Sequence, residues 1–289
     1  MDYLYFPGCT LYTKAKNFDQ TARNCSILLG FELKEMDNWT CCGATFPLAT
    51  DNIMALLAPS RILAKAKQEG DTLTTLCAIC FNVIKRTNKL IQTDQEKREK
   101  INNFIEMNYQ GDLKVLHYLE ILKNDIGFLK LKEKIKKPLE GLKTAPYYGC
   151  MLLRPFEEME FDDKERPTIF EEFLLALGAQ PVEFPYKIEC CGSFQSVGSP
   201  EVATECAYRI LSSAIKQGAE AMVSTCPMCT FNIDHKQVDI KKKYLDFKSI
   251  PVFYFTQLLG IAMGLDIQTL GFDQNEIDPM PLLREKGLV

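Results

Sequence analysis

The chain has 289 residues, of which 46% are hydrophobic and 25% charged, so it is long enough for two globular domains with cores of their own. The net charge of −4 excludes the basic surface that marks most nucleic-acid-binding proteins. No run approaches the roughly 18–20 apolar residues of a membrane span, and no basic and apolar leader opens the chain. We therefore expect no membrane span and a cytoplasmic location.

The predicted elements of the first half lead from one cysteine group to the next. In chain order they are a strand at 2–6 ending at Cys9, a helix ending at Gly30, an extended piece ending at Cys41–Cys42, a helix at about 51–69, a strand at 72–76 ending at Cys77-x-x-Cys80, and a closing strand and helix. Glycine after the last periodic residue is a common helix stop, and this supports the end at Gly30.

The second half repeats this order. Its elements are a strand at 144–148 ending at Cys150, a helix ending at Gly178, an extended piece ending at Cys190–Cys191, a helix at about 200–217, a strand at 221–225 ending at Cys226-x-x-Cys229, and a strand and helix within 250–265. The spacing of 34 residues from the double cysteine to the C-x-x-C is identical in both halves. Such matching spacing indicates an internal duplication.

Strands that alternate with helices predict an α/β fold made of two duplicated lobes with parallel sheets. Right-handed crossovers place all strand carboxyl ends at one edge of a parallel sheet, so the five cysteines of each half should gather there. A lysine-rich segment at 130–143 is the natural linker. We accordingly predict a first lobe at 1–140, including the linker from about 126, and a second lobe at 141–289.

Twelve cysteines in a chain without an export signal indicate metal or redox chemistry rather than a disulfide scaffold. Thiolates are soft ligands that select iron–sulfur clusters, zinc or copper(I). A structural zinc site takes four tetrahedral ligands, commonly from two C-x-x-C-like arms, whereas each half has one such arm, an adjacent pair and a distant single cysteine. A multi-iron core offers several metal corners, so iron–sulfur binding is favoured over zinc and over disulfide or thioredoxin-like chemistry.

A few residues lie outside this pattern. Cys25 and Cys206 align with apolar helix residues of the other half, so we expect both to act as small buried hydrophobic groups. His117 falls in a strand-like run and is expected to pack. His235, six residues beyond Cys229, is a candidate for protonating a product thiolate.

The repeated C…CCG…C-x-x-C pattern resembles the cysteine-rich CCG-domain family over nearly the whole chain. Within that family the closest resemblance is to the B subunit of heterodisulfide reductase, and it is carried by residues 6–9, 148–155, 226–232 and 253–259. The resemblance implies two Rossmann-like lobes related by a pseudo-twofold axis, with one non-cubane [4Fe-4S] cluster per lobe at the lobe interface. The implied ligands are Cys9, Cys41, Cys42, Cys77 and Cys80 for the first cluster, and Cys150, Cys190, Cys191, Cys226 and Cys229 for the second.

The same resemblance implies an activity in methanogenesis: reduction of the mixed disulfide of coenzyme M and coenzyme B to two thiols. Electrons would come from outside, because the chain has no ferredoxin-type cysteine run and no dinucleotide fingerprint. The implied partners are the iron–sulfur C subunit and the flavin-bearing A subunit of heterodisulfide reductase. Arg154, close after Cys150, is a candidate for binding an acidic group of the substrate. The alternative is an iron–sulfur subunit for another disulfide, or for glycolate, lactate or succinate–quinone electron transfer.

Overall fold

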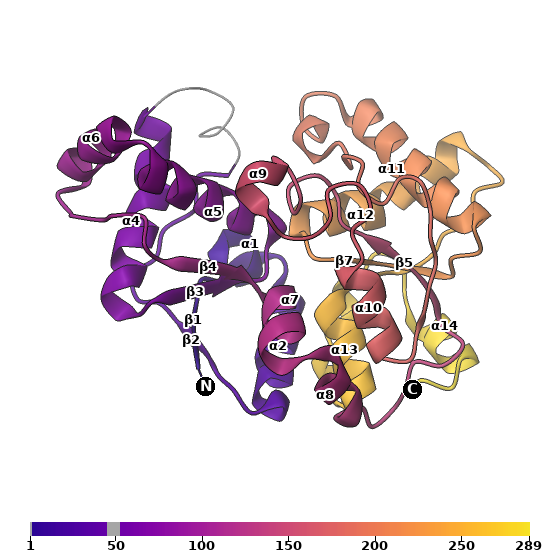
Figure 1. Cartoon of the computed structure of the whole chain (residues 1–289). Coiled ribbons are helices and arrows are strands. Elements are labelled where there is room, and N and C mark those ends of the chain that lie inside the picture. Colours follow the sequence, from indigo (N-terminus) through magenta and orange to yellow (C-terminus); the bar gives the residue numbers. More distant parts are fainter. Residues whose placement is uncertain (1, 45–52) are drawn as a thin grey trace.

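The computed structural model describes residues 2–44 and 53–289. The first lobe contains β1 (Tyr3–Tyr5), α1 (Gly8–Thr13), α2 (Lys16–Leu29), β2 (Leu33–Glu35), α4 (Ile53–Glu69), β3 (Thr72–Thr75), α5 (Ala78–Thr93), α6 (Gln95–Ile105), β4 (Lys114–His117), α7 (Tyr118–Glu120), the π-helix η1 (Ile121–Ile126) and α8 (Phe128–Glu133). Figure 1 shows it beside the second lobe.

The second lobe repeats the strand order of the first but differs in its shorter helices. It contains β5 (Lys143–Tyr147), α9 (Phe156–Met159), α10 (Ile169–Ala176), β6 (Gln180–Pro181), η2 (Ser193–Gln195), α11 (Pro200–Lys216), β7 (Ala221–Ser224), α12 (Pro227–Lys243), β8 (Val252–Tyr254), α13 (Phe255–Met263), η3 (Ile267–Thr269), η4 (Phe272–Gln274) and α14 (Met280–Glu285).

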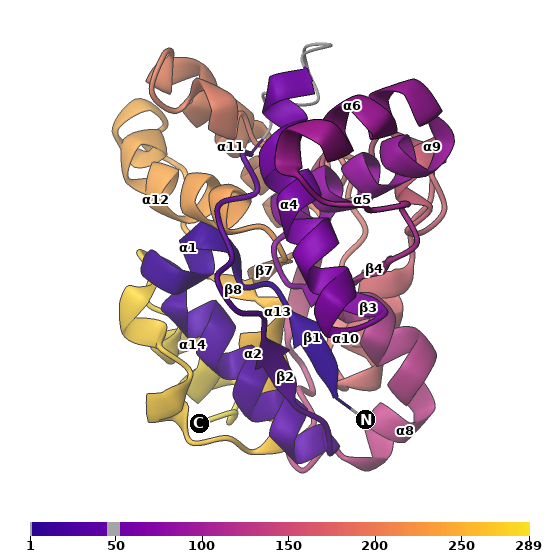
Figure 2. The same ribbon diagram turned by 90° about the vertical axis from the view of Figure 1, so that its left-hand side faces the viewer.

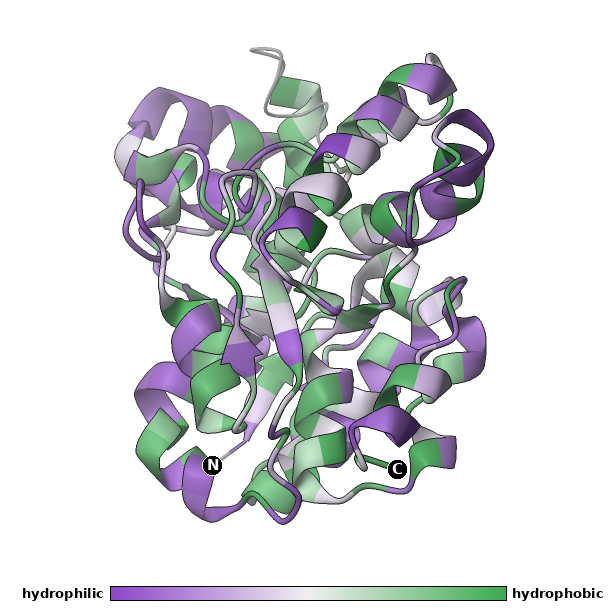
Figure 3. Cartoon of the chain, turned by 90° about the vertical axis from the view of Figure 1, so that its right-hand side faces the viewer, coloured by the Kyte–Doolittle hydropathy of each residue, from purple (hydrophilic) through white to green (hydrophobic). Residues whose placement is uncertain are grey.

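Each lobe is built on a four-stranded parallel sheet, in the orders β2-β1-β3-β4 and β6-β5-β7-β8. The central strands β3 and β7 are almost wholly buried, as expected for parallel strands covered by helices on both faces. Hydrophobic and hydrophilic residues are interspersed along the surrounding helices (Figure 3), and helices such as α2 and α11 bury one side on the core, whereas α13 is buried throughout. The predicted α/β fold of two duplicated lobes is confirmed.

The predicted element limits agree closely with the structure. The helix α2 ends at Leu29, and Gly30 follows with a left-handed φ of 90°. The predicted helix at 51–69 is seen from Ile53 to Glu69, while positions 51 and 52 lie outside the described residues. The lysine-rich segment begins within α8 rather than as an open linker. The domain boundary near residue 140 stays a prediction.

The two lobes are joined by helices of one lobe that pack on helices of the other. The closing helix α13 of the second lobe packs on α2 of the first, where Phe18 stacks on Tyr254 at 4.3 Å between ring centroids. The hydroxyls of Thr21 and Thr256 are 2.5 Å apart in the same contact. On the other side of the interface α8 of the first lobe packs on α10 of the second, and Lys123 of η1 pairs with Glu172 of α10 at 3.0 Å.

The pseudo-twofold relation breaks after the first cysteine of each lobe. Only six residues separate Cys9 from α2, whereas a much longer segment that includes α9 separates Cys150 from α10. This longer segment packs on α5 of the first lobe. Asn82 on α5 fixes it by donating to the carbonyl oxygens of Met151, at 2.7 Å, and Arg154, at 2.6 Å.

Candidate metal centres

All ten predicted ligands lie at the carboxyl edges of the two sheets. In the first lobe Cys9 is in α1 directly after β1, the pair Cys41–Cys42 follows β2, and Cys77 caps the N-terminus of α5. The second lobe places its five cysteines at the same points, with Cys226 as the N-cap of α12. The edge predicted from right-handed crossovers is therefore the edge observed.

The sulfur atoms of the first lobe form a continuous chain of contacts. Cys9 Sγ lies 3.8 Å from Cys41 Sγ, and Cys42 Sγ lies 3.6 Å from Cys80 Sγ. Cys41 and Cys42, and likewise Cys80 and Cys77, are close enough for one thiol to shift the pKa of the other. All five predicted ligands of this lobe are thus brought together.

The second lobe forms the same chain in the same order. Cys150 interacts with Cys190, Cys190 with Cys191, and Cys229 with Cys226. The Sγ atoms of Cys191 and Cys229 are 3.4 Å apart. We call these two sets of five the first and the second sulfur group. Within residues 2–44 and 53–289, no three or more His, Cys, Asp or Glu side chains are grouped to hold a single metal ion.

Each sulfur group favours a thiolate at one member of its double cysteine. Hydrogen bonding with Cys41, and then with Cys80, lowers the pKa of Cys42 well below its ordinary value. Hydrogen bonding with Cys150, and then with Cys191, lowers the pKa of Cys190 in the same way. The backbone N–H of Gly192 also donates to Cys190 Sγ at 3.4 Å. The same hydrogen bonding raises the pKa of the other member of each pair, Cys41 and Cys191, so each double cysteine favours a single thiolate.

Two glycines that the sequence analysis did not single out lie against the sulfur groups. Gly8 has a φ of +73°, and a Cβ at this position would come within 2.8 Å of Cys80 Sγ. Gly149 is its counterpart in the second lobe, with a φ of +67° and a distance of 3.3 Å to Cys229 Sγ. Each glycine immediately precedes the first cysteine of its repeat, and this position in the sequence could have indicated that it lies beside the sulfur group.

A pocket of about 670 Å³ opens between the two lobes. It is bounded by the segment that follows Cys9, by the start of α12 and by Tyr254 (Figure 2 shows α1 beside α12). Pro227 and Met228, which line it, are the two residues between Cys226 and Cys229. The buried hydroxyl of Tyr254 lies close enough to Cys226 and Cys77, from different lobes, for both thiols to add to the effect of burial and raise its pKa.

The equivalent space on the other side of the pseudo-twofold axis is filled. His117 takes the place of Tyr254, and Phe161 from the long segment before α10 covers it at 5.7 Å between ring centroids. Phe161 also contacts Phe81 of α5 at 5.8 Å. The asymmetry of the connection after the first cysteine therefore leaves one side of the lobe interface open and closes the other.

The remaining predicted residues fall into three environments. His117 is fully buried and bonds the carbonyl oxygen of Leu76, so it packs as expected. His235 lines the interlobe pocket and pairs with Glu276 at 2.8 Å. The charge of Arg154 contributes to lowering the pKa of Cys190, after hydrogen bonding with Cys150 and Cys191.

The two extra cysteines behave differently from each other. Cys25 is fully buried in the contact between α2 and α13, as predicted. Cys206 is only partly buried, and its sulfur would lie 3.2 Å from a Cβ at Gly192. It therefore lies beside the second sulfur group rather than in an apolar core, and sequence alignment of the halves carries no signal of this.

Two segments of the chain, residues 3–85 and 144–234, match the CCG cysteine-rich domain. The chain belongs to the cysteine-rich CCG-domain family. It is 34% identical to the 8-methylmenaquinol:fumarate reductase membrane anchor subunit of Wolinella succinogenes, over 97% of this chain and 99% of that protein. It is 30% identical to the B subunit of the ferredoxin:CoB-CoM heterodisulfide reductase of Methanosarcina mazei, over 96% of this chain and 94% of that one.

One solved structure has the same fold as this CCG-domain chain. It is a hypothetical protein from Helicobacter pylori, with a TM-score of 0.76 at 14% identity, and this chain covers 51% of it while 95% of this chain is matched. No helix among the described residues is long and apolar enough to cross a bilayer. The family and its full-length relatives support an iron–sulfur oxidoreductase subunit that works with partner subunits.

Proposed function

We propose that each sulfur group holds one non-cubane [4Fe-4S] cluster, through Cys9, Cys41, Cys42, Cys77 and Cys80 in the first lobe and Cys150, Cys190, Cys191, Cys226 and Cys229 in the second. The donor set fits such a cluster, because five soft thiolates per lobe match a core with several iron corners. Cys9, Cys41 and Cys190 are exposed, so their side chains are free to turn outward around an inorganic core. When bound, the clusters supply electrons one at a time.

The proposed reaction is the reduction of the mixed disulfide of coenzyme M and coenzyme B. The S–S bond breaks, two electrons and two protons are taken up, and two thiols are released. The electrons come from an external donor, which we propose to be the iron–sulfur C subunit of heterodisulfide reductase, itself supplied by the flavin-bearing A subunit. A cytoplasmic location and a role in methanogenesis belong to the same proposal.

The chain's own residues in the pocket suit this substrate in part. Lys14, next to the segment that carries Cys9, provides a cation in the pocket wall for an acidic group of the substrate. His235 is placed to give a proton, since it lines the same pocket and is held by Glu276. The single observation that carries the proposal is that one open pocket touches the cysteine-bearing segments of both lobes.

A second candidate is electron exchange with a quinol. It is favoured by the relative of Wolinella succinogenes, whose name includes 8-methylmenaquinol. The pocket also presents Met228, Phe231 and Tyr254, which would suit a flat, apolar ring. This candidate keeps both clusters and changes only the substrate.

The two candidates are separated by one assay. The anaerobically purified protein complex is given a reduced viologen dye and either the heterodisulfide or a menaquinone analogue, and dye oxidation is followed. The proposal predicts oxidation with the disulfide and two thiols formed for every two electrons. Consumption of the quinone alone would establish the second candidate instead.

Variants of the double cysteines test the cluster assignment in the same assay. Cys42→Ala or Cys191→Ala should lower disulfide reduction by a factor of about 100 or more, in line with the loss of a group that acts on the reaction directly. Circular dichroism should show that both variants still fold. The control is Cys25→Ala, which removes a thiol outside both groups and should keep the activity. Normal turnover in Cys42→Ala or Cys191→Ala would refute the assignment.

A further inference from the structure

Each lobe has a charged network between its long helix and the segment that leads to its double cysteine, and the cation lies on a different element in each lobe. Positions 148 residues apart are equivalent around Gly30 and Gly178, whereas the double cysteines of the two lobes lie 149 residues apart. By the first spacing Arg23 is equivalent to Glu171 and Glu35 to Glu183, while Trp39 and Lys187 both lie in the segment that leads to the double cysteine. The first lobe thus has its cation on the long helix, and the second has it on the loop that leads to the double cysteine.

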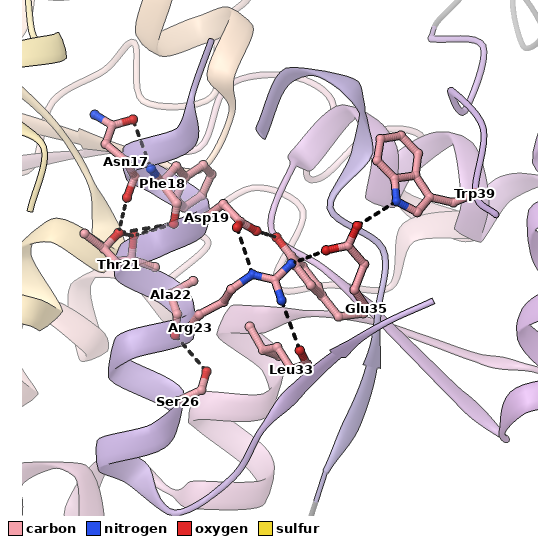
Figure 4. Close-up of polar contacts among 12 residues, drawn as sticks. Asn17, Phe18, Asp19, Thr21, Ala22, Arg23, Ser26, Leu33, Glu35 and Trp39 are labelled. Atoms are coloured by element: carbon pink, nitrogen blue, oxygen red, sulfur yellow. Dashed lines mark hydrogen bonds and ion pairs between the residues drawn. The ribbon is translucent and has the colours of Figure 1, made fainter. Parts of the chain in front are cut away.

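In the first lobe the network runs from α2 to the loop before Cys41 (Figure 4). The Arg23 guanidinium lies 2.8 Å from Asp19 Oδ2 and 2.6 Å from Glu35 Oε2. Trp39 Nε1 donates to Glu35 at 2.9 Å, and the hydroxyl of Tyr5 donates to Asp19 at 2.7 Å. Helix α2, strand β1 and the approach to Cys41 are therefore tied together through one guanidinium.

In the second lobe the network is more deeply buried. Lys187 Nζ donates to Glu171 at 2.6 Å, to Glu183 at 3.0 Å and to the carbonyl oxygen of Pro167 at 3.2 Å. The side chains of Lys187 and Glu171 are only 10% and 11% exposed, whereas Arg23 in the first lobe is 31% exposed. All three protons of the Lys187 ammonium thus have acceptors.

Lys187 also holds the approach to the first cysteine of its lobe. Its carbonyl oxygen accepts from the backbone N–H groups of Tyr148, at 2.9 Å, and Gly149, at 3.2 Å. The hydroxyl of Tyr148 donates to Glu171, the ion-pair partner of Lys187. One residue thereby links the segment that ends in Cys150 to the segment that ends in Cys190.

We propose that Lys187, through Glu171, is the positioning residue of the second sulfur group, and that Arg23, through Glu35, is the positioning residue of the first. Each network holds together two of the three segments that bring cysteines to its own group, and neither reaches the other lobe. The effect of breaking one network should therefore stay within one lobe. This inference rests on the proposed function only where clusters are used to read it out.

The test compares Lys187→Met and Arg23→Met with the wild-type protein purified anaerobically. Two readouts are taken: the electron paramagnetic resonance signals of the reduced protein, and backbone hydrogen exchange by mass spectrometry. Lys187→Arg and Arg23→Lys are the conservative variants that should restore both readouts. Lys286→Met is the matched control, because it breaks an ion pair with Glu220 in which the lysine side chain is also largely buried, at 18% exposure.

We expect Lys187→Met to alter one of two cluster signals and to raise exchange severalfold in residues 148–150 and 188–192, leaving residues 8–10 and 40–43 unchanged. Arg23→Met should do the reverse, with a smaller effect because its network is more exposed. Arg23→Met also keeps the test decisive if Lys187→Met fails to fold. Equal changes in both lobes, or no local change in exchange, would overturn the inference. Absence of iron from the wild-type protein would refute the proposed function but not this inference. The inference can still be tested then, because hydrogen exchange is measured without a cluster.

Discussion

Single residues at the edge of each sheet decide how closely the sulfur atoms can approach one another. Gly8 and Gly149 have left-handed φ values and face Cys80 and Cys229 with no side chain between them. Any other residue would add a Cβ to the space beside the second sulfur of the C-x-x-C. Gly43 and Gly192 can be recognised in the sequence because they belong to the repeated CCG motif, whereas Gly8 and Gly149 only precede a single cysteine.

Replacing Gly8 by alanine should disable the first sulfur group without unfolding the chain. The added carbon would meet Cys80 Sγ at 2.8 Å, so we expect loss of about half of the bound iron, as one of two equal clusters fails to assemble. Gly30→Ala is the control, because Gly30 has a φ of +90° with open space around it and shares only the backbone penalty of about 1 kcal/mol. Iron analysis separates them, and equal iron in both variants would contradict the prediction.

His117 gives the protein a pH dependence that can be measured by itself. Burial lowers the pKa of His117 to about 3, so the folded chain holds it neutral while the unfolded chain takes up a proton below its ordinary value of 6.5. Stability from this residue is therefore complete above pH 6.5 and is lost as the pH falls toward 3. Between about pH 7.5 and 5.5 the loss should be about 1.4 kcal/mol.

The measurement is urea unfolding of the wild-type chain and of His117→Gln at both pH values. The other titrating groups are common to both proteins, so their contributions cancel in the difference. The wild-type protein should lose more stability than the variant across this range. An identical pH dependence in the two proteins would show that His117 titrates normally in the folded chain.

At the level of helices and strands, the reciprocal packing of closing helices explains why the two lobes form one interface. Helix α13 is buried along its whole length against α2, although it belongs to the other sheet. The sequence indicated a buried strand and helix at 250–265 but carried no signal of which lobe they cover, because amphipathic periodicity describes one element at a time. The closed side of the interface was unpredictable for the same reason: α9 has only four residues and no periodic pattern.

Truncating Phe18 should test this interface. Phe18 is fully buried and stacks on Tyr254 across the lobes, so Phe18→Ala should lower the free energy of unfolding by about 3–5 kcal/mol. Phe104→Ala is the control, since Phe104 is 55% exposed and its loss should change stability by less than about 1 kcal/mol. Urea denaturation gives both values. A small effect at Phe18 would mean that the lobes hold together without this contact.

Across the whole molecule, a duplicated chain brings two equivalent sulfur groups to one interface and then distinguishes them. The fold and the convergence of five cysteines per lobe followed from the repeated spacing of Cys41–Cys42 and Cys190–Cys191 to their C-x-x-C motifs. The position of the cation in each charged network and the pocket between the lobes did not, since both depend on which side chains meet across elements. The two sulfur groups therefore have different surroundings, although the lobes share one repeated pattern.

The most direct test of the account is the metal content of the protein purified without oxygen. Two four-iron clusters predict about eight iron atoms and a matching amount of acid-labile sulfide per chain, with a visible absorbance that bleaches on reduction. About two zinc ions per chain and no chromophore would contradict the central claim, because the ten cysteines would then serve structural sites.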